Sequence, residues 1–174
     1  MSTKSSHTAL GLVIAGALLR LMPHPPNVAP VGAMSLFSGA RLAGWQAYAV
    51  PLLLMALTDP ILGAIQGFRP FGARTFFVYG SFLISVWIGR RLRDNSSAAR
   101  IGAAAFACAL QFYLITNLYP WYRAYPHTAA GLLACYIAAL PFFGRTLAGN
   151  FLYAGLFFGV HAWLTRHNKQ AVAQ

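Results

Sequence analysis

Apolar residues occur in long runs along this chain, and short stretches with arginine, proline or glycine separate them. Most of the runs approach the length of about 20 residues that a helix needs to cross a bilayer. The alternating segments of about ten residues that are typical of membrane barrels are absent. The pattern therefore predicts an all-α integral membrane protein that forms a single domain over 1–174. The expected helices cover 5–22, 29–40, 45–66, 75–89, 98–119 and 146–163.

Prolines and small residues refine these boundaries. The first run ends at Pro23, which begins a proline cluster that cannot continue a helix. The second run is short and rich in glycine, alanine and serine, a composition that suits close helix packing. Pro51 and Pro60 interrupt the third run, so a kink or break is expected there. Pro120 is expected to close the fifth.

The C-terminal third allows two interpretations. Residues 127–143 are apolar, but they include Pro141, and the pair Gly144-Arg145 follows them. They form either a seventh span or a cap before a sixth span. Basic residues favour the cytoplasmic side of a membrane. Six spans place Lys4, Arg41, Arg90, Arg91, Arg93, Arg100, Arg166 and Lys169 inside, and Arg20, Arg69, Arg74, Arg123 and Arg145 outside. We therefore expect six spans, cytoplasmic N and C termini, and a partly helical outer cap over 124–143.

Composition agrees with this class. Hydrophobic residues make up 58% of the chain and charged residues 9%, whereas soluble domains carry about 25% charged residues. The net charge of +11 does not indicate nucleic-acid binding, because the basic residues form no continuous stripe. Cys108 and Cys135 have no metal-ligand spacing and are expected to be packing residues.

Asp59 is the only acid inside an apolar run, and a carboxylate within a membrane is by default a candidate functional group. It precedes Pro60, and Asp before Pro favours the N-cap of a helix that restarts there. A structural salt bridge and direct ligand contact are the alternatives. No nucleophile, histidine and carboxylate set can be assembled, and no phosphate-binding glycine loop is present.

Several polar residues fall toward the predicted outer side. Tyr79, Tyr113 and Asn117 lie within spans, where they indicate either an interfacial aromatic belt or the wall of an apolar pocket. Arg74 and Arg145 lie at the outer ends of two spans. Together the outer arginines are suited to an anionic or amide-rich ligand, although each alone is suited to membrane anchoring.

Three motifs carry a resemblance to a known family. They are Leu19-Arg20-Leu21-Met22-Pro23-His24-Pro25-Pro26-Asn27 with Ala29-Pro30-Val31-Gly32-Ala33-Met34, then Thr58-Asp59-Pro60-Ile61-Leu62-Gly63, and Ala138-Ala139-Leu140-Pro141-Phe142-Phe143-Gly144-Arg145-Thr146-Leu147. Over nearly the whole chain, this layout resembles the six-helix substrate-binding (S) subunits of energy-coupling-factor (ECF) vitamin transporters. Within them it is most similar to the solitary BtuM-type cobalamin transporters, and it is also similar to a sister group of membrane proteins with the same layout.

The resemblance implies uptake of cobalamin, or a related corrinoid, across a bacterial inner membrane through a pocket open to the periplasm. A separate ECF-type ATPase module is an implied partner. The residues expected to contact the ligand are Gly80, Tyr79, Arg74, Tyr113, Asn117, Tyr125, Arg145 and His24. No metal ligand is expected from the chain itself, because Gly80 stands where the family places the cysteine that binds the cobalt of the corrin ring.

Gly80 departs from the family pattern. The BtuM-type branch offers a cysteine to cobalt within a Val-Tyr-Cys-Ser-Phe-like run, and this chain reads Val78-Tyr79-Gly80-Ser81-Phe82. Gly80 is therefore an engineered replacement, a natural variant whose cobalt keeps its own base or takes water, a sign of a different small nutrient, or simply a residue for close helix packing. A membrane enzyme acting on the cobalt centre or on a lipid, and a structural subunit without ligand, are the alternative functions.

Overall fold

The computed structural model describes residues 3–23 and 25–172, and every regular element in them is a helix. The predicted all-α class is confirmed. The helices are α1 (Thr3–Leu19), α2 (Val31–Arg41), α3 (Gln46–Gln66), α4 (Ala73–Arg90), α5 (Ala98–Thr116), α6 (Leu118–Ala124) and α7 (Ala129–Val172). Prolines 51 and 60 lie inside α3 without ending it.

Three helical stretches of the described chain are long and apolar enough to cross a membrane: Gln46–Gln66, Ala98–Ala124 and Ala129–His167. Large apolar side chains point outward from them. On α3, Leu53, Leu57, Ile61 and Ile65 follow one another at intervals of four residues, and each is between 46% and 69% exposed. An apolar stripe of this kind faces lipid in a membrane helix, whereas water would make it an aggregation site.

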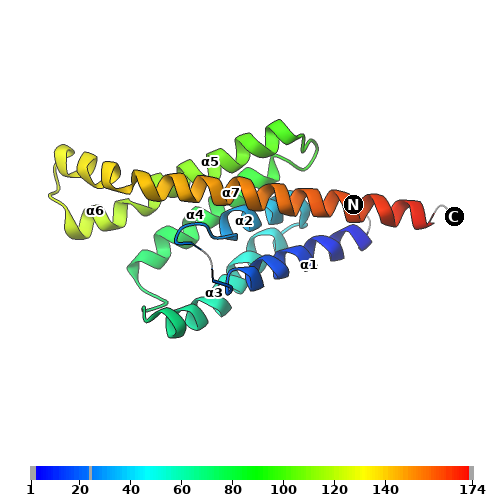
Figure 1. The fold of residues 1–174 in the computed structure, drawn as a ribbon, viewed down its shortest axis with the longest axis horizontal. Coiled ribbons are helices and arrows are strands. Elements are labelled where there is room, and N and C mark those ends of the chain that lie inside the picture. Colours follow the sequence, from blue (N-terminus) through cyan, green and yellow to red (C-terminus); the bar gives the residue numbers. More distant parts are fainter. Residues whose placement is uncertain (1–2, 24, 173–174) are drawn as a thin grey trace.

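Helix α2 lies at the centre of the bundle (Figure 1) and packs against α1, α3, α4, α5 and α7. Its 11 residues extend about 17 Å, which is shorter than the hydrocarbon core of about 30 Å. Nine of them are buried. The predicted helix over 29–40 is present, but it is a core helix enclosed by protein and too short to span a membrane alone.

Helices α2 and α4 touch through their backbones at two glycines. A Cβ on Gly39 would lie 2.0 Å from the carbonyl oxygen of Val86, and a Cβ on Gly89 would lie 2.0 Å from that of Leu36. Neither glycine has room for any side chain. The small residues predicted to allow close packing in the second run therefore do so against α4.

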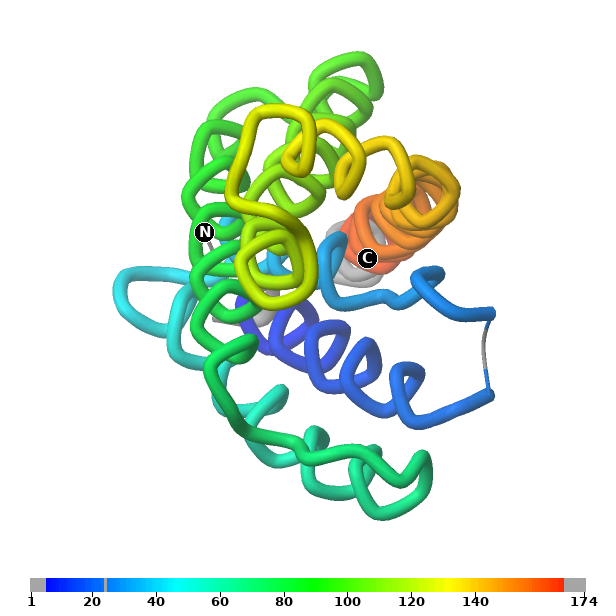
Figure 2. The backbone as a smooth tube through the Cα atoms, turned by 90° about the vertical axis from the view of Figure 1, so that its left-hand side faces the viewer, coloured from blue at the N-terminus to red at the C-terminus, as the bar shows by residue number. Residues whose placement is uncertain are grey.

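Successive helices α1 to α5 alternate in direction, and α7 returns along the bundle (Figure 1). One end, which we call the basic end, holds the connection 91–97 together with Arg41, Arg90, Arg91, Arg93 and Arg100. The opposite end holds the connection 67–72 and α6. Figure 2 views the bundle from this opposite end, with α4 on one side and α7 on the other, α6 near the middle, and the α1–α2 connection at the rim.

Arginines at the basic end bind backbone carbonyls. Arg93 donates from Nε to the Gly39 carbonyl at 3.1 Å, and from Nη2 to the Leu42 carbonyl. Arg41 donates to Ser96 Oγ at 2.6 Å, which joins the end of α2 to the 91–97 connection. Cations at the C-terminus of a helix satisfy its free carbonyls and interact favourably with its dipole.

The C-terminal third differs from the prediction. A single helix, α7, runs for 44 residues through Pro141, a length of about 66 Å. The expected cap over 124–143 is therefore not a separate segment: residue 124 ends α6, and 129–143 form the first part of α7. Proline removes one hydrogen bond, and neighbouring helices in a membrane protein can accommodate that loss. The prediction gave too much weight to Pro141 and Gly144.

The fifth predicted span is also divided differently. Helix α5 ends at Thr116, and the short α6 begins at Leu118 and contains Pro120. Asn117 forms the junction, where its Nδ2 donates to the Tyr113 carbonyl at 2.7 Å. The side chain thus occupies a backbone carbonyl at the end of α5, and the chain resumes as a helix one residue later.

Candidate functional site

A polar cluster joins α3, α4 and the residue that follows α1. Arg20 forms an ion pair with Asp59 and donates from Nη1 to Thr58 Oγ1 at 2.6 Å. The hydroxyl of Tyr79 donates to the second carboxylate oxygen of Asp59 at 2.6 Å. The side chains of Arg20 and Asp59 are only 14% and 9% exposed. This is a buried ion pair with both carboxylate oxygens in use.

The favoured interpretation of Asp59 was therefore wrong. Helix α3 continues through Asp59 and Pro60 to Gln66, so no helix restarts there and no N-cap is needed. The salt-bridge alternative is confirmed. Sequence alone could not identify Arg20 as the partner, because the two residues are 39 positions apart.

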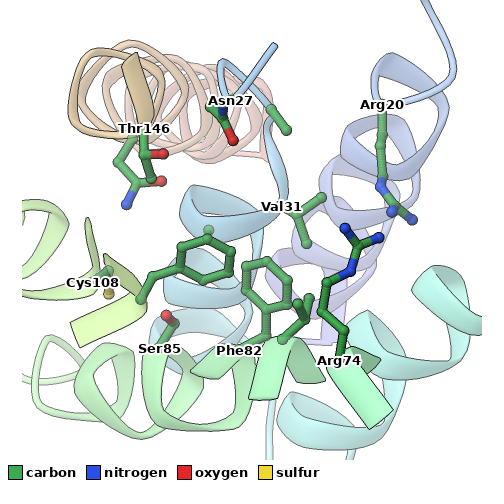
Figure 3. A pocket seen from close by; sticks show the side chains of 13 residues that line it. Arg20, Asn27, Val31, Arg74, Phe82, Ser85, Cys108 and Thr146 are labelled. Atoms are coloured by element: carbon green, nitrogen blue, oxygen red, sulfur yellow. The ribbon is translucent and has the colours of Figure 1, made fainter. Parts of the chain in front are cut away.

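Beside this cluster lies a cavity of about 290 Å³. It is enclosed by α2, α4, α5, α7, the α1–α2 connection and Arg20 (Figure 3). Its lining residues are Arg20, Asn27, Ala29, Val31, Gly32, Arg74, Val78, Phe82, Ser85, Cys108, Phe112, Thr146 and Asn150. Arg74 and Asn27 are exposed whereas Ser85, Cys108 and Asn150 are buried, so the mouth is at the first pair and the floor at the others.

The walls of the cavity are mostly apolar, with polar groups at both ends. Phe82 and Phe112 form one wall, with ring centroids 5.2 Å apart. At the floor, Asn150 Nδ2 donates to the Ala105 carbonyl at 3.3 Å, and Ser85 Oγ donates to the Ser81 carbonyl at 3.1 Å. Apolar walls with a few placed polar groups are typical of small-molecule sites.

Gly32 admits the Asn150 side chain to the cavity. A Cβ on Gly32 would lie 2.4 Å from Asn150 Oδ1, so any larger residue would displace the amide. Asn150 is 3% exposed, and it approaches the N-terminal turn of α2 from α7. Glycine at this position thus places a hydrogen-bonding group on an otherwise apolar floor.

The two guanidinium groups lie on the same side of the cavity (Figure 3). Arg20 is held by Asp59 and Thr58. Arg74 makes no hydrogen bond or ion pair with any residue that the structure describes. Arg74 therefore keeps its planar set of N–H donors for a ligand or for water.

The structure brings some of the predicted residues together and separates others. Arg74 lines the cavity. Tyr113 and Asn117 line a second cavity of about 290 Å³, which shares Asn27, Phe112 and Thr146 with the first. The hydroxyl of Tyr113 donates to the Tyr136 carbonyl at 2.5 Å, so it joins α5 to α7.

Gly80 and Tyr79 lie elsewhere. Both line an open, almost wholly apolar groove of about 500 Å³ on the outer side of α4, with Phe76 and Leu83. Val78 and Phe82 face the cavity, and Gly80, two positions from each, points about 200° away. A Cβ on Gly80 would meet no atom within 4 Å, so the close-packing explanation for this glycine is not supported.

Two further predicted residues, Tyr125 and Arg145, do not line the two cavities. Tyr125 follows α6 as its C-cap, and Arg145 is an exposed residue of α7. His24 lies outside the described residues. The prediction missed Phe82, Ser85, Cys108, Thr146 and Asn150 as lining residues. Asn150 carried a usable signal, since an amide within an apolar helix needs a partner.

Within residues 3–23 and 25–172, no group of three or more His, Cys, Asp or Glu side chains comes together in a way that could hold a metal ion.

Comparison with known proteins identifies a family for this chain but no individual relative. No curated protein and no solved structure matches the chain significantly. A family model described as "Family of unknown function (DUF6580)" matches residues 2–172, and the chain belongs to that family.

Proposed function

We propose that this chain is a membrane uptake protein that binds a small solute in the cavity between α2, α4, α5 and α7. The observation that carries the proposal is the cavity itself, whose apolar walls, polar floor and exposed Arg74 lie at one end of a helical bundle. The layout resembles the S subunits of ECF transporters. We place six passes in a bacterial inner membrane, with α2 as a short pass inside the bundle and both termini cytoplasmic.

The geometry favours a solute smaller than a corrinoid. Sites for drug-sized ligands measure about 300–1,000 Å³, and this cavity, at about 290 Å³, falls just below that range. Gly80, where a cobalt-binding cysteine was expected, lies on the outer side of α4. A different small nutrient is therefore better supported than cobalamin.

The enzymatic alternative has weaker support. Both oxygens of Asp59 already accept hydrogen bonds, and Asp94, the other acid, is exposed in the 91–97 connection. A carboxylate so engaged is a poor general base. Uptake needs no such group, and any ATP-driven step depends on a separate complex.

A paired substitution on α4 tests the proposal. Val78 lines the cavity, whereas Phe76 is 82% exposed on the lipid-facing side. Val78→Trp should fill the cavity, and Phe76→Trp should leave it open. We expect a small metabolite to co-purify with the wild type and Phe76→Trp and to be lost from Val78→Trp, as measured by mass spectrometry of extracts. Identical extracts from all three proteins would contradict a solute-binding function.

The same preparations test the corrinoid alternative. A corrinoid absorption spectrum in the purified wild type would select cobalamin over a smaller solute. In that case Gly80→Cys should change the visible spectrum only if the corrin ring lies in the apolar groove beside Gly80 and not in the cavity, because there a thiolate could displace an axial ligand of cobalt. The space around Gly80 accepts the new side chain, so the substitution itself should not disturb the fold. A colourless protein that binds no added corrinoid would remove this alternative.

A further inference from the structure

We infer that the solute is a small organic anion whose carboxylate or phosphate group binds Arg74; this rests on the proposed uptake function. The charges around the cavity carry the inference. Among its lining residues, Arg20 and Arg74 are the charged ones, and both are positive. Asp59 neutralises Arg20 from outside the lining. One positive charge, that of Arg74, is left without a protein partner among the described residues.

The difference between the two arginines sets their roles. Arg20 uses Nη1 for Thr58 and Nη2 for Asp59, so its position is fixed. Arg74 is exposed at the mouth, in the first turn of α4. A guanidinium group matches the two oxygens of a carboxylate or the oxygens of a phosphate in a bidentate pair. Arg74 is therefore the recognition residue, and Arg20 adds positive potential beside it.

The other lining residues indicate the shape and polarity of the rest of the solute. Phe82 and Phe112 provide a flat apolar surface, and Asn150 and Ser85 offer hydrogen bonds at the floor. The cavity of about 290 Å³ has the volume of about ten water molecules at ~30 Å³ each. This room suits a single ring or a short chain attached to the anionic group.

Matched small molecules isolate the contribution of the charge. Benzoate and phenyl phosphate carry an anionic group on one ring, and benzamide has the shape of benzoate without its charge. We expect calorimetry in detergent micelles to show saturable, millimolar or tighter binding of at least one anion to the wild type. Benzamide should bind at least about tenfold more weakly, as expected for loss of a charge-assisted contact.

Substitutions of Arg74 test whether this residue causes the preference for an anion over benzamide. Arg74→Gln should weaken binding of the anion by about tenfold or more and leave the affinity for benzamide unchanged. Arg74→Lys should fall between, because it keeps the charge without the planar fork. Arg69→Gln is the matched control, since Arg69 is exposed in the adjacent connection and does not line the cavity. Equal unfolding temperatures would establish that the variants are folded.

Three results would overturn the inference. They are equal affinity for benzamide and for the anion that binds more tightly, unchanged binding of that anion in Arg74→Gln, and no binding of either anion at millimolar concentration. A neutral metabolite lost from Val78→Trp would then still support the uptake function, so the two failures are distinguishable.

A lipid headgroup presents the same anionic chemistry, so its contribution needs a separate measurement. Benzoate binding should be equal in bilayer discs of phosphatidylcholine and of phosphatidylglycerol. Loss of binding in phosphatidylglycerol discs would show that a lipid headgroup occupies Arg74, and would overturn the assignment to a soluble solute.

Discussion

Helices α2 and α4 meet in two different ways at their two ends. At the basic end their backbones touch through Gly39 and Gly89, and Arg93 binds carbonyls of residues 39 and 42. At the opposite end, Val31 of α2 and Val78 of α4 both line the cavity. The closed end depends on the absence of side chains, and the open end depends on polar contacts around a space. The same helix pair thus provides both a close backbone contact and part of the wall of the proposed binding site.

The open end needs support from outside the helix pair. The ion pair of Arg20 and Asp59, with Tyr79 on the second carboxylate oxygen, joins α3, α4 and the end of α1 beside the cavity. These contacts hold α4 in place where α2 cannot. The arginines of the two ends therefore differ in their contacts: Arg93 completes a helix terminus, Arg20 is held by an acid, and Arg74 has no hydrogen bond or ion pair with a described residue.

The largest expected effect comes from removing the acid that supports the open end. Asp59→Ala leaves Arg20 as an unpaired, largely buried charge, which should lower the free energy of unfolding by about 3–5 kcal/mol. Reversible unfolding in mixed detergent micelles measures this change. Asp94→Ala is the control, because Asp94 is exposed and its loss should change stability by less than about 0.5 kcal/mol. Equal effects of the two substitutions would mean that the ion pair does not hold the open end.

The second-largest loss of stability is expected from a substitution at the closed end. Gly89→Ala places a Cβ against the Leu36 carbonyl oxygen, so α2 and α4 must separate. We expect a loss of about 2–3 kcal/mol, the upper part of the range for overpacking. Gly80→Ala, in the same helix, meets open space and should gain about 0.5–1 kcal/mol, because alanine favours a helix over glycine. If both variants lost stability equally, a cost common to any side chain added on α4, and not the backbone contact, would explain the result at Gly89.

The two ends also differ in how far sequence could predict them. Apolar length and small residues were enough for α3, α4 and the close packing of α2, because each is a local property. The ion pair of Arg20 with Asp59 and the meeting of Asn150 with Gly32 join distant positions, and no local pattern contains them. Arg74 was found because it lies at a helix end. Pro141 misled the prediction because a proline in a packed membrane helix removes only one hydrogen bond.

The smallest changes in stability are expected from two arginine substitutions, one at each end. Arg93→Gln loses charge-assisted bonds to the Gly39 and Leu42 carbonyls, but Arg93 is exposed, so we expect a loss of only about 1–2 kcal/mol. Partial desolvation of its guanidinium group and the nearby charge of Arg90 lower the pKa of Arg93, yet arginine stays charged in proteins, so the loss should not vary between pH 6 and pH 8.

Arg74→Gln removes the same charge at the open end and should leave stability within about 0.5 kcal/mol of the wild type, because no described residue depends on it. Unfolding of both variants in the same micelles measures the difference. A destabilising Arg74→Gln would show that this arginine supports the fold, and the division between a closed structural end and an open binding end would then fail. If Arg93→Gln left the free energy of unfolding unchanged, the glycine contact alone would keep α2 and α4 together at the basic end.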